Sequence, residues 1–395
     1  SILDRSGRPL AESTGPVGSI ARIYPYPALG PLVGYTDPVY GQAGLEASQD
    51  AYLRGLRGYP TLMISWDNLL YGQPPPGLDV RLSLDLDLQT QADQLFAGHN
   101  GALVLLNAST GEVLAMATSP SFDANALDAN WQTLVNDPRA PLLNRATMGM
   151  YPAGNVLGVF LLASNPAGAT EPFIVTDRSG CATIPAGPSL AEALSAGCSE
   201  PVGQLAGSLG PQAVLNLLDG LGFFSSPVFP VETLSTSKPG MISDAYSYIR
   251  GLEADQQSGS YLQVSPLQMA LAAASFSNHG ERLSPRLAMA VENPQGGWVM
   301  LPVSGQPQPA LPAQASTNVT GLLSSKDLPI WQVVASSGIP NNLEDSTRST
   351  YTWYIGGTLP EWKGASLALA LLLEEDDPQT ALTIGQSIFL HTIYP

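Results

Sequence analysis

The sequence contains few of the residues from which metal and nucleic-acid sites are built. Its 395 residues include two cysteines and three histidines, and His99, His279 and His391 are never paired at the spacing of metal ligands. A zinc site needs several Cys, His or acidic ligands close together, so this inventory nearly excludes one. We therefore expect neither a metal ion nor a cofactor.

Positive charge and long apolar runs are scarce as well. Sixteen Lys and Arg residues stand against 33 Asp and Glu, for a net charge of −17. An acidic protein repels polyphosphate, which argues against nucleic-acid binding. No run of 18 apolar residues occurs and no signal peptide is visible, so no segment is expected to cross a membrane as a helix.

What the sequence does contain suits a folded, loop-rich protein. Hydrophobic residues make up 44% of the chain, enough for a sizeable core, and the length suits two or three domains. The 39 glycines and 35 prolines, together with only 12% charged residues, are typical of an extracytoplasmic protein. A linker at residues 74–77 divides the chain into predicted domains at 1–77 and 78–395.

The pattern of elements predicts an α+β fold. Two apolar runs at 102–106 and 113–117, joined by a turn sequence, predict a β-hairpin. Further strands are expected at 330–335, 350–355 and 366–374, with helices between, including 156–163, 190–194 and 202–209. Residues 290–316 are rich in Pro, Gly and Gln and are predicted to form a loop. This order indicates an antiparallel sheet flanked by helices.

A set of short motifs, in order along nearly the whole chain, resembles the class B penicillin-binding proteins, and most closely their PbpA-type subgroup. The pieces that carry the resemblance include Asp4-Arg5, Gly44-Leu45-Glu46, Ser83-Leu84-Asp85, Thr110-Gly111-Glu112-Val113, Asn144-Arg145-Ala146, Tyr151-Pro152-x-Gly154 and Pro266-Leu267-Gln268-Met269. The resemblance implies the penicillin-binding transpeptidase fold, with a five-stranded antiparallel sheet between helices and a smaller, elongated N-terminal domain.

Members of this family are serine acyl transferases with three catalytic motifs, Ser-x-x-Lys, Ser-x-Asn and Lys-[Thr/Ser]-Gly. Aligned on Tyr151-Pro152-x-Gly154, the nucleophilic serine becomes Asn155 and its lysine becomes Gly158. The second motif falls on 197–199, and the third on 336–338. The residues at these degenerate positions are Asn155, Gly158, Gly197, Ser199, Ser336, Ser337 and Gly338. We therefore expect no catalytic residue at the family's site.

Cys181 and Cys198 flank the second motif. They are 17 residues apart, and an isolated pair in an extracytoplasmic protein is expected to form a disulfide. The alternative is two buried free thiols, which behave as small hydrophobic side chains.

Three functions remain open on these observations. The first is an inactive penicillin-binding protein that acts as a binding or scaffold protein in peptidoglycan assembly. The second is an active transpeptidase with a relocated serine nucleophile, and the third is a non-covalent sensor of stem peptides or β-lactams. The resemblance implies partners among peptidoglycan stem peptides or cell-wall synthesis proteins. It also implies a location on the outer face of the bacterial cytoplasmic membrane, with an anchor that this sequence does not include.

Overall fold

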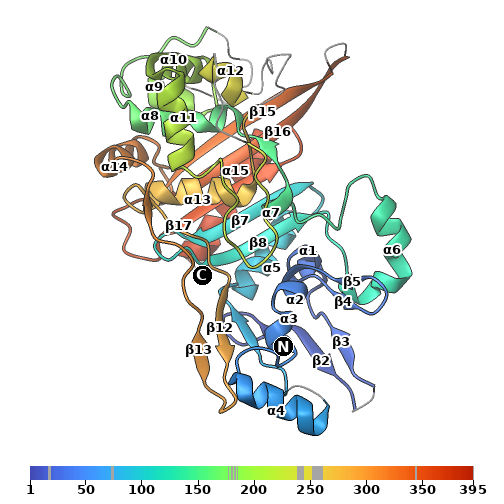
Figure 1. The fold of residues 1–395 in the computed structure, drawn as a ribbon. Coiled ribbons are helices and arrows are strands. Elements are labelled where there is room, and N and C mark those ends of the chain that lie inside the picture. The colour runs from blue at the N-terminus through green and yellow to red at the C-terminus, as the bar shows by residue number, and fades with distance from the viewer. Residues whose placement is uncertain are drawn as a thin grey trace.

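A five-stranded antiparallel sheet forms the centre of the computed structural model (Figure 1). The structure describes residues 1–16, 19–72, 75–176, 178, 181, 184, 186–237, 244–250, 261–342 and 345–394. The strand order is β15 (Ile330–Asn342), β16 (Asp345–Thr358), β17 (Leu367–Leu373), β7 (Gly101–Asn107) and β8 (Val113–Ser119). Every neighbouring pair is antiparallel. The predicted sheet, hairpin included, is confirmed.

Alternation along the strands explains why helices cover both faces of the sheet. In β7, Leu103 and Leu105 belong to one apolar cluster while Val104 and Leu106 belong to another. Successive side chains of a strand point to opposite faces. The first cluster is completed by α5 (Leu86–Leu95) and α15 (Pro378–Ile393), and the second by α13 (Pro266–Ser277). The sheet is therefore the middle layer of three.

A group of short helices lies beyond α13, at the end of the molecule nearest β15 (Figure 1). It contains η3 (Gly154–Leu157), α8 (Gly158–Ser164), α9 (Leu190–Ser195), α10 (Ser199–Leu209), α11 (Pro211–Gly220), α12 (Ala245–Arg250) and α14 (Ala313–Leu322). Ser189 and Glu192 form a capping box that fixes the start of α9. These helices carry the first two degenerate motifs and bring them to the edge of the sheet.

A second sheet joins parts of the chain that are far apart in sequence. Its order is β13 (Trp298–Met300), β12 (Ala288–Glu292), β6 (Val80–Leu82), β1 (Ile2–Leu3), β2 (Pro9–Thr14) and β3 (Ala21–Ile23). The prediction of a loop over 290–316 was wrong, because the end of β12, all of β13 and β14 (Gln308–Pro309), and the first turn of α14 lie there. The sheet takes strands from both sides of residue 77, and the division into domains at 77/78 stays a prediction.

The remaining elements belong mainly to the N-terminal part. They are η1 (Pro27–Leu29), α1 (Gly30–Val33), β4 (Thr36–Asp37), β5 (Gly41–Gln42), α2 (Gly44–Ser48), α3 (Asp50–Leu53), α4 (Thr61–Tyr71), η2 (Ala124–Ala126), α6 (Leu127–Asn136), α7 (Arg145–Met148), β9 (Tyr151–Pro152), β10 (Gln263–Val264) and β11 (Glu281–Arg282). In the described part of the chain, no helix has the length and hydropathy to span a bilayer. Across the same residues, no group of three or more Cys, His, Asp or Glu side chains could hold a metal ion.

Asp93 on α5 gives a test of the burial of this helix. Burial raises the pKa of Asp93 to about 6, from an ordinary 3.8, despite a hydrogen bond that Gln89 Nε2 donates to its Oδ1 at 3.1 Å. The folded state therefore favours the neutral acid, and stability is lost as the pH rises from about 4 to above 6.

Asp93→Asn should stabilise the protein by on the order of 2 kcal/mol at about pH 8, and by much less at about pH 4. Urea unfolding at the two pH values measures both effects. Glu361→Gln, at an exposed loop position, controls for the loss of one negative charge. An equal effect of Asp93→Asn at both pH values would refute this account of the carboxyl group.

Candidate functional site

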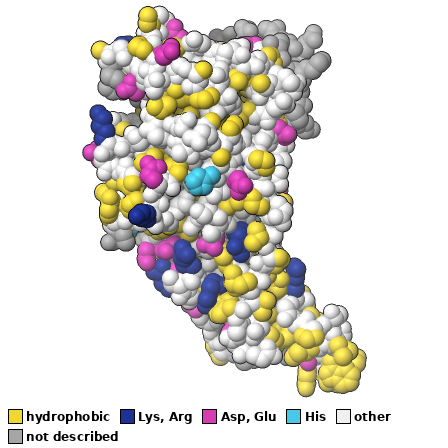
Figure 2. Space-filling model, turned by 90° about the vertical axis from the view of Figure 1, so that its left-hand side faces the viewer, with side chains coloured by type: hydrophobic (Ala, Val, Ile, Leu, Met, Phe, Trp, Pro, Cys, Tyr) yellow, Lys and Arg dark blue, Asp and Glu magenta, His cyan; other side chains and the backbone are white. Residues whose placement is uncertain are grey.

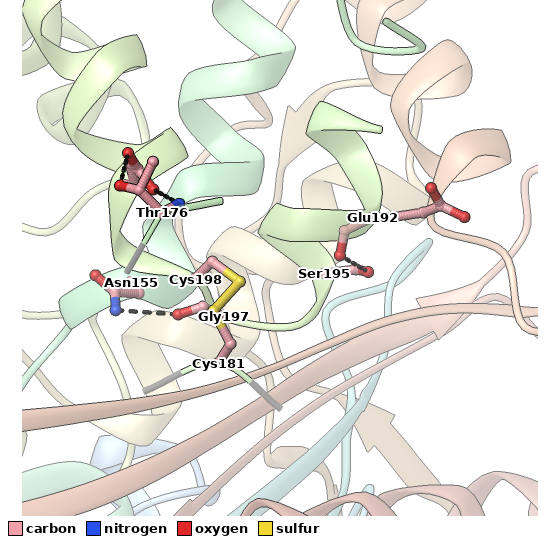
Figure 3. Close-up of a disulfide and its surroundings, with 8 residues drawn as sticks. Asn155, Thr176, Cys181, Glu192, Ser195, Gly197 and Cys198 are labelled. Carbon is pink, nitrogen blue, oxygen red and sulfur yellow. Dashed lines mark hydrogen bonds between the residues drawn. A yellow bond between two sulfur atoms is a disulfide. The ribbon is translucent and has the colours of Figure 1, made fainter. Parts of the chain in front are cut away.

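The first two degenerate motifs meet through a hydrogen bond between Asn155 and Gly197 (Figure 3). Asn155 lies in η3 and is only 5% exposed. Its Nδ2 donates to the Gly197 carbonyl oxygen at 3.1 Å, while its Oδ1 is buried without a hydrogen-bond partner among the described residues. The side chain at the family's nucleophile position thus points into the protein and holds the second motif.

Gly158, at the lysine position, lies where two helices approach α8 closely. A Cβ atom added to Gly158 would lie 2.5 Å from Leu194 Cδ2 and 2.9 Å from Val202 Cγ2. Both of these side chains are fully buried. The space into which a side chain at position 158 would extend is therefore filled by α9 and α10.

Gly197, at the serine position of the second motif, has a backbone conformation suited to glycine. Its φ is +73°, in the left-handed region, and an added Cβ would lie 2.6 Å from the Ala335 Cα and 2.7 Å from the Val334 oxygen. These are backbone atoms of β15 and cannot rotate away. The second motif is thus packed directly against the strand that carries the third motif.

A disulfide joins Cys198, the central residue of the second motif, to Cys181 (Figure 3). Close by, the Thr176 backbone N–H and hydroxyl each donate to Glu200 at 2.7 Å. Cys198 is fully buried, and Ser199, at the motif's asparagine position, is 6% exposed at the first residue of α10. These contacts join Thr176 and Cys181 to the start of α10.

Ser336 occupies the position of the third motif's lysine, but its partner is an acid. The Ser336 hydroxyl donates to Asp376 Oδ1 at 2.6 Å, and Asp376 is exposed. Sequence reasoning did not identify Asp376. The acidic run Glu374-Glu375-Asp376-Asp377 directly follows β17 and could have indicated this contact. Since β17 pairs with β16 and β16 pairs with β15, the end of β17 lies near the third motif on β15.

Ser337 and Gly338 complete the third motif and have structural roles. The Ser337 hydroxyl donates to the Pro152 carbonyl oxygen at 3.1 Å, and the Trp353 indole N–H donates to the same oxygen at 2.8 Å. Ser337 is only 6% exposed, and Gly338 pairs with Thr350 in the β15–β16 ladder. Ser337 therefore ties β15 to the segment just before Asn155.

A buried polar network, also missed in the sequence, supports Tyr151 in the segment before the first motif. The Tyr151 hydroxyl donates to Glu374 Oε1 at 2.7 Å, and Arg145 Nε donates to the same oxygen at 2.8 Å. Burial, followed by the Glu374 charge, raises the pKa of the Tyr151 phenol far above its ordinary range. Tyr151 therefore stays protonated and acts as a hydrogen-bond donor, not as a base.

The structure thus brings the three altered motifs together, and at their aligned positions none of the described residues is the family's catalytic serine or lysine. Asn155 contacts Gly197, Gly158 faces α9 and α10, and Gly197 lies on β15, as described above. A serine nucleophile needs a base within hydrogen-bonding reach. Position 155 instead has the amide of Asn155, and the space beside Gly158 is filled by Leu194 and Val202. Position 336 has a serine whose hydroxyl donates to the Asp376 carboxylate.

Restoring the serine of the second motif should destabilise the fold. Gly197→Ser places a side chain at positive φ against the β15 backbone, so we expect a loss of about 2 kcal/mol or more. Gly207→Ala, in α10 with nothing within 4 Å of an added Cβ, should instead stabilise by about 0.5–1 kcal/mol. Urea denaturation measures both, and a Gly197→Ser variant as stable as the parent protein would contradict the packing.

The disulfide should be present in the purified protein. Non-reducing mass spectrometry should find the peptides of Cys181 and Cys198 linked and two hydrogens lighter than the thiol forms. Closing a loop of this size stabilises a fold by about 3 kcal/mol, so reduction should lower the melting temperature. Complete alkylation of both cysteines without reductant would refute the pairing.

Comparison with known proteins identifies the family. A family model described as the penicillin binding protein transpeptidase domain matches residues 101–165 and 176–393. The chain is 27% identical to the peptidoglycan D,D-transpeptidase PbpA of Mycolicibacterium smegmatis over 406 residues, covering 92% of this chain and 81% of that protein. It is also 34% identical over 134 residues to Escherichia coli MrdA, covering 31% of this chain and 21% of MrdA.

Solved structures give the same fold. The penicillin G acyl-enzyme complex of penicillin-binding protein A from M. tuberculosis superposes with a TM-score of 0.82 at 23% identity, covering 99% of this chain and 98% of that one. A D,D-transpeptidase domain from Eggerthella lenta superposes with a TM-score of 0.79 at 21% identity, covering 100% and 98%. With the family match over more than half of its length, the chain belongs to the penicillin-binding protein transpeptidase family, as a class B member.

Proposed function

We propose that this class B penicillin-binding protein is catalytically inactive and serves as a binding or scaffold protein in peptidoglycan assembly. Its relatives include proteins named peptidoglycan D,D-transpeptidases, which supports a role in the same process. By the same similarity, its place is the outer face of the bacterial cytoplasmic membrane, and its partners are cell-wall synthesis proteins.

The packing at Gly158 is the observation that carries this proposal. Acylation by serine requires a base that takes the hydroxyl proton, and in this family a lysine one helical turn after the serine provides it. In this chain Leu194 and Val202 fill the space beside Gly158, as their distances of 2.5 and 2.9 Å from an added Cβ indicate. The base is therefore absent, and the surrounding core has closed over its place.

The charge at the third motif argues against the sensor function. Stem peptides and β-lactams carry a carboxylate, which a lysine at position 336 would attract. Asp376, hydrogen-bonded to Ser336, instead places a negative charge there. The carboxylate of Asp376 would repel the carboxylate of such a ligand, so non-covalent recognition of stem peptides and β-lactams at this site is disfavoured. This repulsion favours cell-wall synthesis proteins over the stem peptide as the partner.

The contact between Ser336 and Asp376 is also what favours the second candidate, an enzyme with a relocated nucleophile. The hydroxyl is within 2.6 Å of a carboxylate that could accept its proton. A carboxylate is, however, a much weaker base than the amine of the family's lysine, so it leaves a hydroxyl protonated near neutral pH. We therefore place this candidate second and make it an outcome of the test.

Labelling with a fluorescent penicillin tests the proposal. The parent protein should form no covalent adduct that survives denaturation and electrophoresis. Asn155→Ser should also remain unlabelled, since its hydroxyl has no base. Asn155→Ser combined with Gly158→Lys should recover little labelling, because positions 336 and 197 would still lack the family's lysine and serine. The effects of residues that act together in catalysis are strongly non-additive.

The PbpA protein of M. smegmatis, labelled in parallel, serves as the positive control, and circular dichroism of each variant verifies folding. A stable label on the parent protein would overturn the proposal. Mapping that label to Ser336 would establish the relocated nucleophile instead, and Ser336→Ala would then abolish it.

A further inference from the structure

Helix α4 (Thr61–Tyr71) carries its apolar side chains on the side that faces solvent. None of its residues is buried. Its large exposed apolar side chains, with their exposed fractions, are Leu62 (78%), Met63 (42%), Trp66 (57%), Leu69 (77%), Leu70 (54%) and Tyr71 (71%). Scattered exposed leucines are ordinary, but a contiguous patch of this kind marks an interaction site.

The spacing within α4 places most of these side chains on one face. Leu62, Trp66, Leu69 and Leu70 stand at positions i, i+4, i+7 and i+8, which form a continuous stripe on an α-helix. Met63 borders this stripe. We call these five residues the α4 apolar face.

The opposite side of α4 faces the protein body. Ile64 and Asp67, three residues apart on that side, are partly covered. Burial, followed by the charges of Asp67 and of Glu292 on β12, raises the pKa of the Tyr59 phenol, which agrees with the partial burial of Asp67. The single charged residue of the helix is therefore turned inward and the apolar face outward.

This helix lies at the extremity of the molecule farthest from the degenerate motifs (Figure 1). Figure 2 shows hydrophobic side chains gathered at the corresponding lower tip. The β12–β13 hairpin reaches the same end of the molecule (Figure 1).

The distribution of charge suits an anionic surface at this end. Residues 1–82 contain six arginines and seven acids, for a net charge of −1, so the remaining residues carry −16 of the total −17. Arg54 and Arg57, shortly before α4, are exposed. Arg54 makes an ion pair with Asp50 at 3.5 Å and Arg57 lies over the Tyr52 ring, but such surface contacts are weak and leave both guanidinium groups accessible. Lipid phosphates are natural partners for such arginines, whereas the acidic remainder of the protein would be held away from them.

We infer that α4 lies in the headgroup region of a lipid bilayer, parallel to the membrane plane, with its apolar face inserted and Arg54 and Arg57 at the phosphates. At 11 residues the helix is too short to span a bilayer. Trp66 is of the amphipathic aromatic type that concentrates at membrane interfaces. The inference builds on the proposed location of the protein, but its test is independent of penicillin chemistry.

Sedimentation with lipid vesicles tests the inference on the 395-residue chain. The protein should co-sediment with vesicles of equimolar phosphatidylcholine and phosphatidylglycerol, and less with phosphatidylcholine alone. Leu62→Ser with Leu69→Ser should lower the partition coefficient by about tenfold or more. The matched control, Ile174→Ser with Val228→Ser, removes side chains that are 82% and 70% exposed elsewhere and should bind as the parent protein does.

Quenching by brominated phosphatidylcholine provides a second readout. It should affect the parent protein and be reduced in Trp66→Phe, which should still co-sediment. A parent protein that stays in the supernatant with both kinds of vesicle would overturn the inference, and so would a double leucine variant that binds equally well. A dimer that Leu62→Ser with Leu69→Ser converts to monomer, without vesicle binding, would assign the face to a second copy of the chain.

Discussion

The close approach of α9 and α10 to α8 at Gly158 is the constraint on which the rest of the altered site depends. Without a side chain at this position, Leu194 and Val202 fill the space and extend the apolar core to the first turn of α8. Asn155 is then surrounded by packed residues and donates its amide to the Gly197 carbonyl. Gly197 in turn fits against the β15 backbone because it has no Cβ. The changes in the three motifs therefore form one packing arrangement.

This arrangement explains why the proposed inactivity is a property of the whole site and not of one residue. A core packed at protein density does not accept an added side chain without shifts in its neighbours. Replacing one residue with its family counterpart would disturb packing before it restored chemistry. The charge near the third motif also opposes substrate binding. The Ser336 hydroxyl donates to Asp376, whereas in the family this position has a lysine that attracts the substrate carboxylate. The transpeptidase fold is kept, while the residues at the three motif positions make packing and hydrogen-bond contacts.

The sequence predicted the central sheet well, because β7, β8 and β17 are apolar runs bounded by turn residues and the predicted parts of β15 and β16 are rich in β-branched and aromatic residues. It failed at 290–316, where β12 pairs with β6 more than 200 residues earlier, since such pairing is decided by tertiary contacts that no local pattern reveals. The motif positions could be placed by order along the chain. Asp376 and Leu194 could not be assigned to the site, because their roles depend on distances across the sheet and between helices.

The orientation of helix α4 is another feature that the sequence alone does not predict. Its sequence contains an ordinary amphipathic spacing, which would usually indicate a helix packed on a core. Only the structure reveals that the apolar face points outward. The two ends of the molecule thus differ: the altered motifs pack together at one end, and the α4 apolar face is exposed at the other.

The release of D-alanine from a peptide that ends in D-Ala-D-Ala tests the central claim most directly, because it follows the family's own reaction and does not depend on which residue attacks. The account predicts a rate no higher than that of the peptide in buffer alone. A rate that exceeds this background, rises in proportion to protein concentration and disappears on heat denaturation would contradict it.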